Sequence, residues 1–154
     1  MKLTITLPND RTKLGSATLG GPVFACLGKS DNGMAAKHNN PSRDPLLPFG
    51  DTPLGVYVGT ITPPRADTAG YGHVSIISLT PVSGDCVKAE KNGREGILCH
   101  SGGLNPTYTQ WGGLRPTFGC VRFHEEDLTA ILNQVLIHGQ RLDVVIQAEA
   151  SPIT

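Results

Sequence analysis

The chain has 154 residues, of which 38% are hydrophobic and 17% charged, and this composition is typical of one globular domain, 1–154, rather than of a disordered chain. Its 13 basic and 13 acidic residues balance and form no basic run, which argues against nucleic acid as a main partner. No apolar run approaches the roughly 18 residues that a transmembrane helix needs. The 19 glycines and 12 prolines indicate many turns and favour a mostly β architecture.

The first part of the chain is expected to form short strands. Apolar and polar residues alternate over 2–7 (KLTITL), which predicts a half-buried strand and not the continuous apolar block of a signal peptide. Further strands are expected at 13–19 and 23–27. Without a signal peptide, we expect the chain to be cytoplasmic as synthesised and to reach any site in the cell envelope by another route.

A long segment without periodicity, 28–53, follows these strands and is rich in Gly, Asn, Asp, Ser and Pro. Connections of this length are usually functional or disordered, although the sequence does not reveal the role of this one. Strands are then expected at 56–61, 71–82 and 96–100. A glycine-rich loop at 101–118 comes next and contains the single tryptophan, Trp111.

The strongest helical pattern lies at 124–138. Its apolar residues follow i, i+3, i+4, i+7 spacing, which predicts one buried stripe formed by Leu128, Ile131, Leu132 and Val135. Acidic residues in the first turn suit the positive end of the helix dipole, and Gly139 is expected to end the helix. A last strand is expected at 141–148, so the sequence predicts a mostly β domain with one main helix.

The four cysteines are Cys26, Cys86, Cys99 and Cys120. They include no C-x-x-C pair, and we expect reduced thiols, although the spacing leaves a Cys86–Cys99 disulfide open. The spacing of these cysteines, His100 and His124 fits no usual zinc pattern, and the adjacent Cys99 and His100 would point to opposite faces of a strand. We therefore expect no metal site.

Cys120 lies just before the helical segment, in the sequence FGCVR. A helix N-terminus and Arg122 would both lower the pKa of its thiol and raise the thiolate fraction. Gly119 removes side-chain bulk beside the sulfur and lets backbone N–H groups point at a developing oxyanion. The alternative is that Cys120 is a small buried side chain, which is common for free cysteines.

His100 ends an expected strand and enters a glycine-containing loop, so its side chain could point into a cleft. A cysteine nucleophile needs a base within hydrogen-bond reach, and that base need not be near in sequence. Ser101 could orient the imidazole or line the cleft. Spacing alone does not choose between His100 and the other four histidines, of which His124 and His138 are explained by the two ends of the helix.

Together these motifs resemble the catalytic motif of the L,D-transpeptidase (YkuD-like) family. His100-Ser101-Gly102 is followed, after a gap of the right length, by Thr117-Phe118-Gly119-Cys120-Val121-Arg122. The family motif has a histidine, then Ser/Thr-x-Gly-Cys, an aliphatic residue and Arg or Asn. The resemblance extends to GDTPLGVY at 50–57 and to the helix and strand after the cysteine, and thus covers about 23–146. Phe118 stands where many members have a second histidine.

The resemblance implies a β-sandwich-like catalytic domain with one main α-helix after the catalytic cysteine. Cys120 would be the nucleophile, His100 the base, and Gly119 with Cys120 the backbone donors to the oxyanion. The expected substrate-binding residues are Arg122, Ser101, Thr117, Phe118, Trp111 and Tyr108. Arg122 would support the pocket or hold a carboxylate. Trp111 and Tyr108 would line the cleft or act as a lid, unless they only pack within their loop.

The implied reaction is acyl transfer on peptidoglycan stem peptides, with no cofactor. Cys120 would attack an amide carbonyl that follows an L-centre and precedes a D-amino acid, and the thioester would pass to an amine on a second stem. Three alternatives stay open. The acceptor could be water or a free D-amino acid, as in an L,D-carboxypeptidase or exchange enzyme. The chain could be a delivered antibacterial effector, or a non-catalytic binding module. The sequence does not reveal the oligomeric state.

Overall fold

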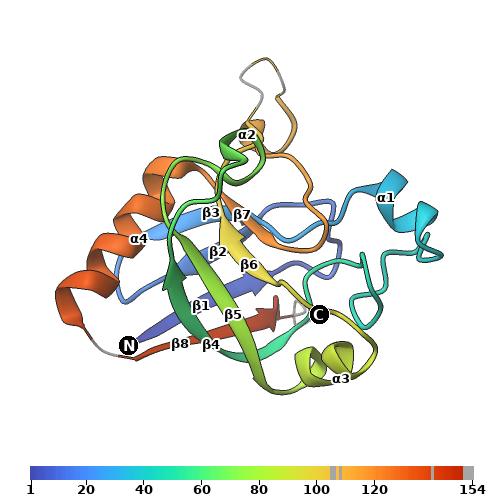
Figure 1. The fold of residues 1–154 in the computed structure, drawn as a ribbon, viewed down its shortest axis with the longest axis horizontal. Coiled ribbons are helices and arrows are strands. Elements are labelled where there is room, and N and C mark those ends of the chain that lie inside the picture. The colour runs from blue at the N-terminus through green and yellow to red at the C-terminus, as the bar shows by residue number, and fades with distance from the viewer. Residues whose placement is uncertain (105–106, 108, 140, 151–154) are drawn as a thin grey trace.

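The computed structural model of the chain describes residues 1–104, 107, 109–139 and 141–150, and its strands form a closed barrel (Figure 1). The order around the barrel is β1-β2-β3-β7-β6-β5-β4-β8. The strands are β1 (Lys2–Leu7), β2 (Gly15–Thr18), β3 (Val23–Leu27), β4 (Gly55–Thr62), β5 (Ile76–Ser83), β6 (Leu98–His100), β7 (Val121–Phe123) and β8 (Leu142–Ala148). The helices are α1 (Asn32–Lys37), α2 (Thr68–Tyr71), α3 (Asp85–Lys91) and α4 (Glu125–His138), with a 3₁₀ turn η1 (Gln110–Gly113).

The expected β-sandwich is wrong, because the sheet closes on itself. β1 and β8 pair in parallel from Lys2↔Asp143 to Leu7↔Ala148, which joins the first and last strands. β8 also pairs antiparallel with β4, so the strands form one continuous sheet rather than two facing ones. The mostly β character is confirmed, whereas the sandwich is replaced by a mixed eight-stranded barrel.

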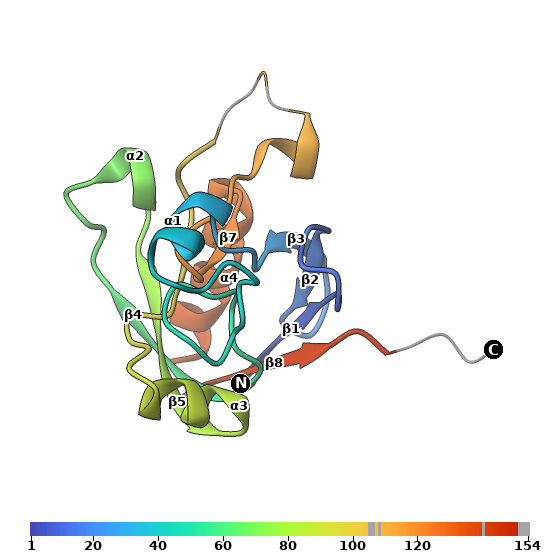
Figure 2. The same ribbon diagram turned by 90° about the vertical axis from the view of Figure 1, so that its right-hand side faces the viewer.

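The short helices were not expected from the sequence. α1 lies within the segment 28–53, where Asp31 caps it by accepting the Met34 N–H at 2.9 Å. The start of the strand expected at 71–82 is wrong, because α2 ends at Tyr71 and β5 begins only at Ile76. α3 follows β5. Figures 1 and 2 show these three helices outside the barrel wall, with α2 near the end of β6 and α3 at the opposite end.

The alternation that predicted β1 is confirmed, because Leu3, Ile5 and Leu7 are buried in the hydrophobic core. The helix stripe is confirmed too: Leu128, Ile131, Leu132 and Val135 belong to that same core. α4 ends at Gly139, which has a left-handed φ of 59°, as the sequence predicted. Figures 1 and 2 show α4 lying against one end of the barrel.

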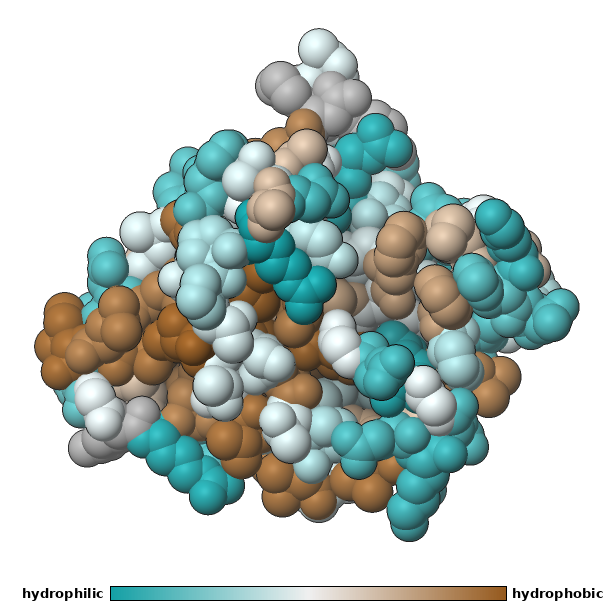
Figure 3. All heavy atoms as spheres, in the orientation of Figure 1, coloured by the Kyte–Doolittle hydropathy of each residue, from teal (hydrophilic) through white to brown (hydrophobic). Residues whose placement is uncertain are grey.

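The exposed face of α4 is apolar near its C-terminal end. Leu136 and Ile137 are 65% and 74% exposed, and Figure 3 shows apolar atoms over this end of the helix. Across the described residues, no helix is both long enough and apolar enough to span a membrane.

Leu128→Ala is expected to lower the free energy of unfolding by about 2–5 kcal/mol, because it leaves a cavity in a fully buried site. Urea denaturation measures the loss. Leu136→Ala on the same helix is the matched control and is expected to change stability by less than about 0.5 kcal/mol, since Leu136 is exposed. Equal losses of stability in the two variants would show that the buried stripe of α4 does not stabilise the hydrophobic core more than its exposed face does.

Candidate active site

A cavity of about 210 Å³ lies where α2, the end of β6 and the start of β7 meet. Its walls come from three segments that are far apart in the sequence. The lining residues are Asp67, Gly70, Tyr71, His100, Pro116, Thr117, Phe118, Cys120 and Arg122. Five residues that the sequence singled out are therefore brought together: His100, Thr117, Phe118, Cys120 and Arg122.

The parallel pairing of β6 with β7 explains why these side chains converge. Cys99 pairs with Val121, and His100 pairs with Arg122. Cys99 and Val121 are both in the hydrophobic core. Because successive side chains of a strand point to opposite faces, the residues on either side of this pair face away from the core. His100, Arg122 and Cys120 consequently line the same cavity.

The ring of His100 is held in one orientation by the backbone of the next residue. Its Nδ1 lies 2.7 Å from the carbonyl oxygen of Ser101. A carbonyl only accepts, so Nδ1 carries the proton and Nε2 is left as the basic nitrogen. Burial lowers the pKa of His100 to about 4, and the cations of Arg122 and Arg65 act in the same direction. The imidazole is therefore neutral near pH 7.

Cys120 as a residue is partly exposed, and its thiol donates weakly to the Gly96 carbonyl oxygen at 3.4 Å. Burial raises the pKa of Cys120, and this effect outweighs the opposing Leu98 N–H and the cations of Arg94 and Arg122. The expected lowering of the thiol pKa is thus wrong. α4 begins only after β7, at Glu125, which is about 16 Å of extended chain beyond Cys120. The helix-dipole effect falls off within the first turn of the helix.

The resting site therefore pairs a neutral thiol with a neutral imidazole. In such a pair the cysteine becomes a strong nucleophile only when its proton moves to a base. His100, with its unprotonated Nε2, lines the same cavity as Cys120, whose thiol proton is directed at the Gly96 carbonyl oxygen in this structure. Transfer of that proton to Nε2 would require the Cys120 side chain to turn toward His100. The arrangement is suited to nucleophilic attack assisted by a general base.

Arg122 links two segments beside the cavity through hydrogen bonds from its guanidinium. It is 6% exposed, and its Nη1 donates to the Gly102 carbonyl oxygen at 2.7 Å while its Nη2 donates to that of Gly70 at 3.3 Å. Its buried Nε has no hydrogen-bond partner among the residues that the structure describes. Burial lowers the pKa of Arg122 to about 10, which leaves it charged near pH 7. A cation on this wall favours an anionic group of a ligand.

Gly103→Ala is expected to displace Arg122, because a Cβ at this position would overlap the guanidinium. Gly20→Ala is the matched control: both glycines have a positive φ, 62° and 80°, but no atom lies within 4 Å of a Cβ built on Gly20. Both variants carry the left-handed strain of about 1–2 kcal/mol. Gly103→Ala is expected to lose about 2 kcal/mol more in urea denaturation, since charge-assisted hydrogen bonds of Arg122 are lost. Equal losses would mean that Arg122 can move aside freely.

Residues of α2 and the segment before it form a wall of the site that the sequence did not reveal. The Tyr71 ring lies against the His100 ring, with centroids 4.8 Å apart, and the Arg65 guanidinium lies 4.7 Å from the Tyr71 ring centroid. Asp67 lines the cavity and caps α2 by accepting the Gly70 N–H at 3.0 Å. The DTAG sequence is a helix-start signal that could have indicated this turn, but not its position over His100.

No protein-family model matches the sequence, and no curated protein matches it. Among solved structures, the chain is similar to Bd1075 of Bdellovibrio bacteriovorus, with a TM-score of 0.55 and 12% identity over 99% of this chain and 49% of that chain. The helical cell shape determining protein Pgp2 from Campylobacter jejuni gives a TM-score of 0.48 and 13% identity over 97% of this chain and 48% of that chain. The chain thus spans about half the length of these structures. The likeness to Bd1075 shows a shared fold alone.

Other residues that the sequence singled out do not line the cavity. The Gly119 N–H donates to the Thr117 hydroxyl at 3.0 Å and is therefore engaged, which differs from a free oxyanion donor. Ser101 is fully buried and meets His100 through its carbonyl oxygen. Trp111 donates from Nε1 to the Thr12 carbonyl oxygen, and Lys29 Nζ lies 5.7 Å from the centroid of its ring. Trp111 does not line the cavity. Tyr108 lies outside the described residues.

The four cysteines are free thiols, so the Cys86–Cys99 disulfide is not formed in this structure. Within the described ranges, no three His, Cys, Asp or Glu side chains are close enough together to hold a metal ion.

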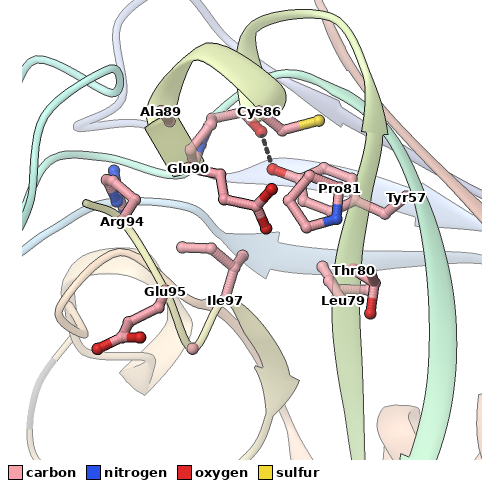
Figure 4. Close-up of a pocket in the computed structure, with 12 residues that line it drawn as sticks. Tyr57, Leu79, Thr80, Pro81, Cys86, Ala89, Glu90, Arg94, Glu95 and Ile97 are labelled. Carbon is pink, nitrogen blue, oxygen red and sulfur yellow. Dashed lines mark hydrogen bonds between the residues drawn. The ribbon is translucent and has the colours of Figure 1, made fainter. Parts of the chain in front are cut away.

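A second cavity, of about 130 Å³, lies beside the segment that contacts Cys120 (Figure 4). Gly96, whose carbonyl oxygen accepts from Cys120, lines it together with Tyr57, Glu90 and Arg94. The Tyr57 hydroxyl donates to the Pro53 carbonyl oxygen at 2.7 Å, and both residues line this second cavity. Arg94 was not singled out from the sequence, because a single arginine in the turn NGREG gives no sign that it is buried.

Proposed function

We propose that the chain is a cysteine-dependent acyltransferase that acts on peptidoglycan stem peptides through a thioester on Cys120. The observation that carries this proposal is the shared cavity of Cys120, His100 and Arg122, three residues whose order and spacing resemble the L,D-transpeptidase motif. The fold likeness to Bd1075 is compatible with the proposal but concerns the fold only. The proposed place of action is the cell envelope.

The first half of the proposed reaction forms the thioester. His100 Nε2 takes the proton of the Cys120 thiol as the sulfur attacks the amide carbonyl before a terminal D-amino acid. The C–N bond of the tetrahedral intermediate then breaks, and the imidazolium gives its proton to the leaving amine. A covalent intermediate divides one difficult step into two easier ones.

The second half releases the acyl group. An amine from a second stem attacks the thioester carbonyl, loses its proton to His100, and leaves a new amide while the sulfur recovers a proton. If water attacks instead, the product is a shortened stem with a free carboxylate, as an L,D-carboxypeptidase would give. The cation of Arg122 would favour the carboxylate of the D-amino acid in the cavity.

The proposal is tested by incubating the protein with a disaccharide-tetrapeptide, alone and with a free D-amino acid, and identifying products by liquid chromatography and mass spectrometry. Cross-linked dimers or exchanged stems indicate transfer to an amine, and tripeptides indicate transfer to water. Both require Cys120, so Cys120→Ala is the control. Folded protein that binds the substrate without converting it would instead indicate a non-catalytic binding module.

A further inference from the structure

Arg94 is a buried cation beside the backbone of the proposed nucleophile. It follows α3 and is 5% exposed. Its Nη1 donates to the carbonyl oxygens of Pro45 at 2.9 Å and Asp51 at 2.8 Å, which fixes the guanidinium in the interior. The side chain therefore cannot move to solvent without breaking two hydrogen bonds.

The other end of this guanidinium points at Gly119. A Cβ built on Gly119 would overlap Arg94 Nη2, so these two residues are in close contact only because residue 119 is a glycine. Gly119 has a φ of 114°, which also favours glycine. Arg94 Nη2 is buried and has no hydrogen-bond partner among the described residues. One residue further along the chain is Cys120.

The charge of Arg94 is not neutralised by an ion pair with any described carboxylate. Burying a cation without a carboxylate costs free energy, and an arginine stays charged even so. In a low-dielectric interior the field of such a charge reaches farther than it does in water. A neutral side chain of similar size would fill the same space without this cost, so the charge itself requires an explanation.

We propose that Arg94 is a positioning residue for the acyl transfer described above, whose fixed cation stabilises the negative charge that develops on Cys120 as its proton leaves. This inference rests on the proposed function. Arg94 does not line the cavity of Cys120. It lies against Gly119, the residue before Cys120, and acts on the thiol by its charge without touching the substrate. The Coulombic attraction between Arg94 and Cys120 acts in the direction that favours the thiolate.

Other charged and titratable groups also act on this pair, among them the buried Cys99 thiol beside Cys120, and they stay constant in the comparison of Arg94 variants. Those facing Arg94 or Cys120 are Arg122, Arg65, Asp51, Arg11, Tyr57 and His100, and Glu90 and Glu95 share the second cavity with Arg94. Variants at Arg94 leave all of them in place.

The test is the pH dependence of Cys120 alkylation by iodoacetamide, followed by peptide mapping, in the full chain. Arg94→Gln removes the charge and keeps donors for the Pro45 and Asp51 carbonyl oxygens. It is expected to raise the apparent pKa of Cys120 by about one unit and to slow alkylation at neutral pH about tenfold. Arg94→Lys keeps the charge and is expected to stay within about threefold of wild type. If Arg94 only supported the structure, Arg94→Gln and Arg94→Lys would slow Cys120 alkylation to the same extent.

A second variant has the opposite sign and covers the case in which Arg94→Gln does not fold. Asp51→Asn removes a negative charge that acts on Arg94, together with the Asp51–Arg43 ion pair. It keeps an acceptor for the Ser30 N–H and the backbone carbonyl that Arg94 uses. It is expected to speed alkylation of Cys120 a few-fold. Folded Arg94→Gln with a wild-type profile, equal losses in Arg94→Gln and Arg94→Lys, or no acceleration in Asp51→Asn would each overturn the inference.

Alkylation needs no substrate, so the two proposals fail separately. If wild type forms no thioester with a stem peptide while Arg94→Gln still shifts the alkylation profile, the proposed function fails and the effect of Arg94 on the thiol stands. If wild type forms the thioester and Arg94→Gln keeps the wild-type profile and acylation rate, only the inference about Arg94 fails.

Discussion

Cys120→Ala is expected to abolish acyl transfer from a disaccharide-tetrapeptide, with a loss of at least about 10³-fold in rate. The methyl group cannot form the thioester through which the reaction would proceed. The loss is measured as release of the terminal D-amino acid per minute. Because Cys120 is partly accessible rather than a core side chain, the variant is expected to unfold at nearly the wild-type urea concentration.

The matched control is Cys26→Ala, which removes a thiol from the hydrophobic core and not from the cavity. Burial raises the pKa of Cys26 to about 12, so this thiol is inert near pH 7. Cys26→Ala is expected to lose stability but to keep the acylation rate within about threefold of wild type. Full activity in Cys120→Ala would remove the nucleophile from the proposal.

His100→Gln is expected to slow formation of the thioester about 10²- to 10⁴-fold, because it removes the general base. In wild type the pKa of His100 is lowered to about 4 by burial. The acylation rate should therefore persist at pH 5 to 6 and fall only as pH drops through about 4. His138→Gln, on the exposed end of α4, is the control and is expected to keep the wild-type profile.

The same shift affects stability, and its sign follows from proton binding. His100 is neutral in the folded state down to about pH 4 but takes a proton near pH 6.5 when unfolded. The contribution of His100 to the free energy of unfolding is therefore complete above about pH 6.5. It is lost as the pH falls from there to about 4, and the total loss is about 3 kcal/mol. His100→Gln should remove this part of the pH dependence in urea denaturation. For the acylation rate, a fall in activity as the pH drops through about 6.5, rather than through about 4, would contradict a buried, neutral His100.

The elements that could be predicted from the sequence are those whose pattern is local. Alternation over 2–7 and the apolar stripe of 124–138 correspond to β1 and α4, because a half-buried strand and helix each leave a period in the sequence. Barrel closure leaves no such signal. It depends on β8, the last strand, pairing with both β1, the first strand, and β4 in the middle of the chain. The sequence pattern of each strand alone would be the same in a sandwich.

The candidate site was predictable in part for the same reason. His100, Cys120 and Arg122 occur in a recognisable order, and the pairing of β6 with β7 turns that order into one cavity wall. Tyr71 lies in α2, and Arg94 lies in the turn after α3. Both helices are too short to leave a periodic pattern that would have placed these residues near Cys120. The thiol pKa was predicted with the wrong sign, because burial of Cys120 outweighs the nearby cations.

The most direct test of the central claim is intact mass spectrometry of the protein after brief incubation with a disaccharide-tetrapeptide, followed by peptide mapping. We expect an adduct on the peptide that contains Cys120, with the mass of the donor less its terminal D-amino acid. Hydroxylamine, which cleaves thioesters, should remove it. The adduct should not form in Cys120→Ala. Folded wild-type protein that gives neither adduct nor product, or an adduct on a different residue, would show that Cys120 is not the nucleophile of an acyl transfer from this donor.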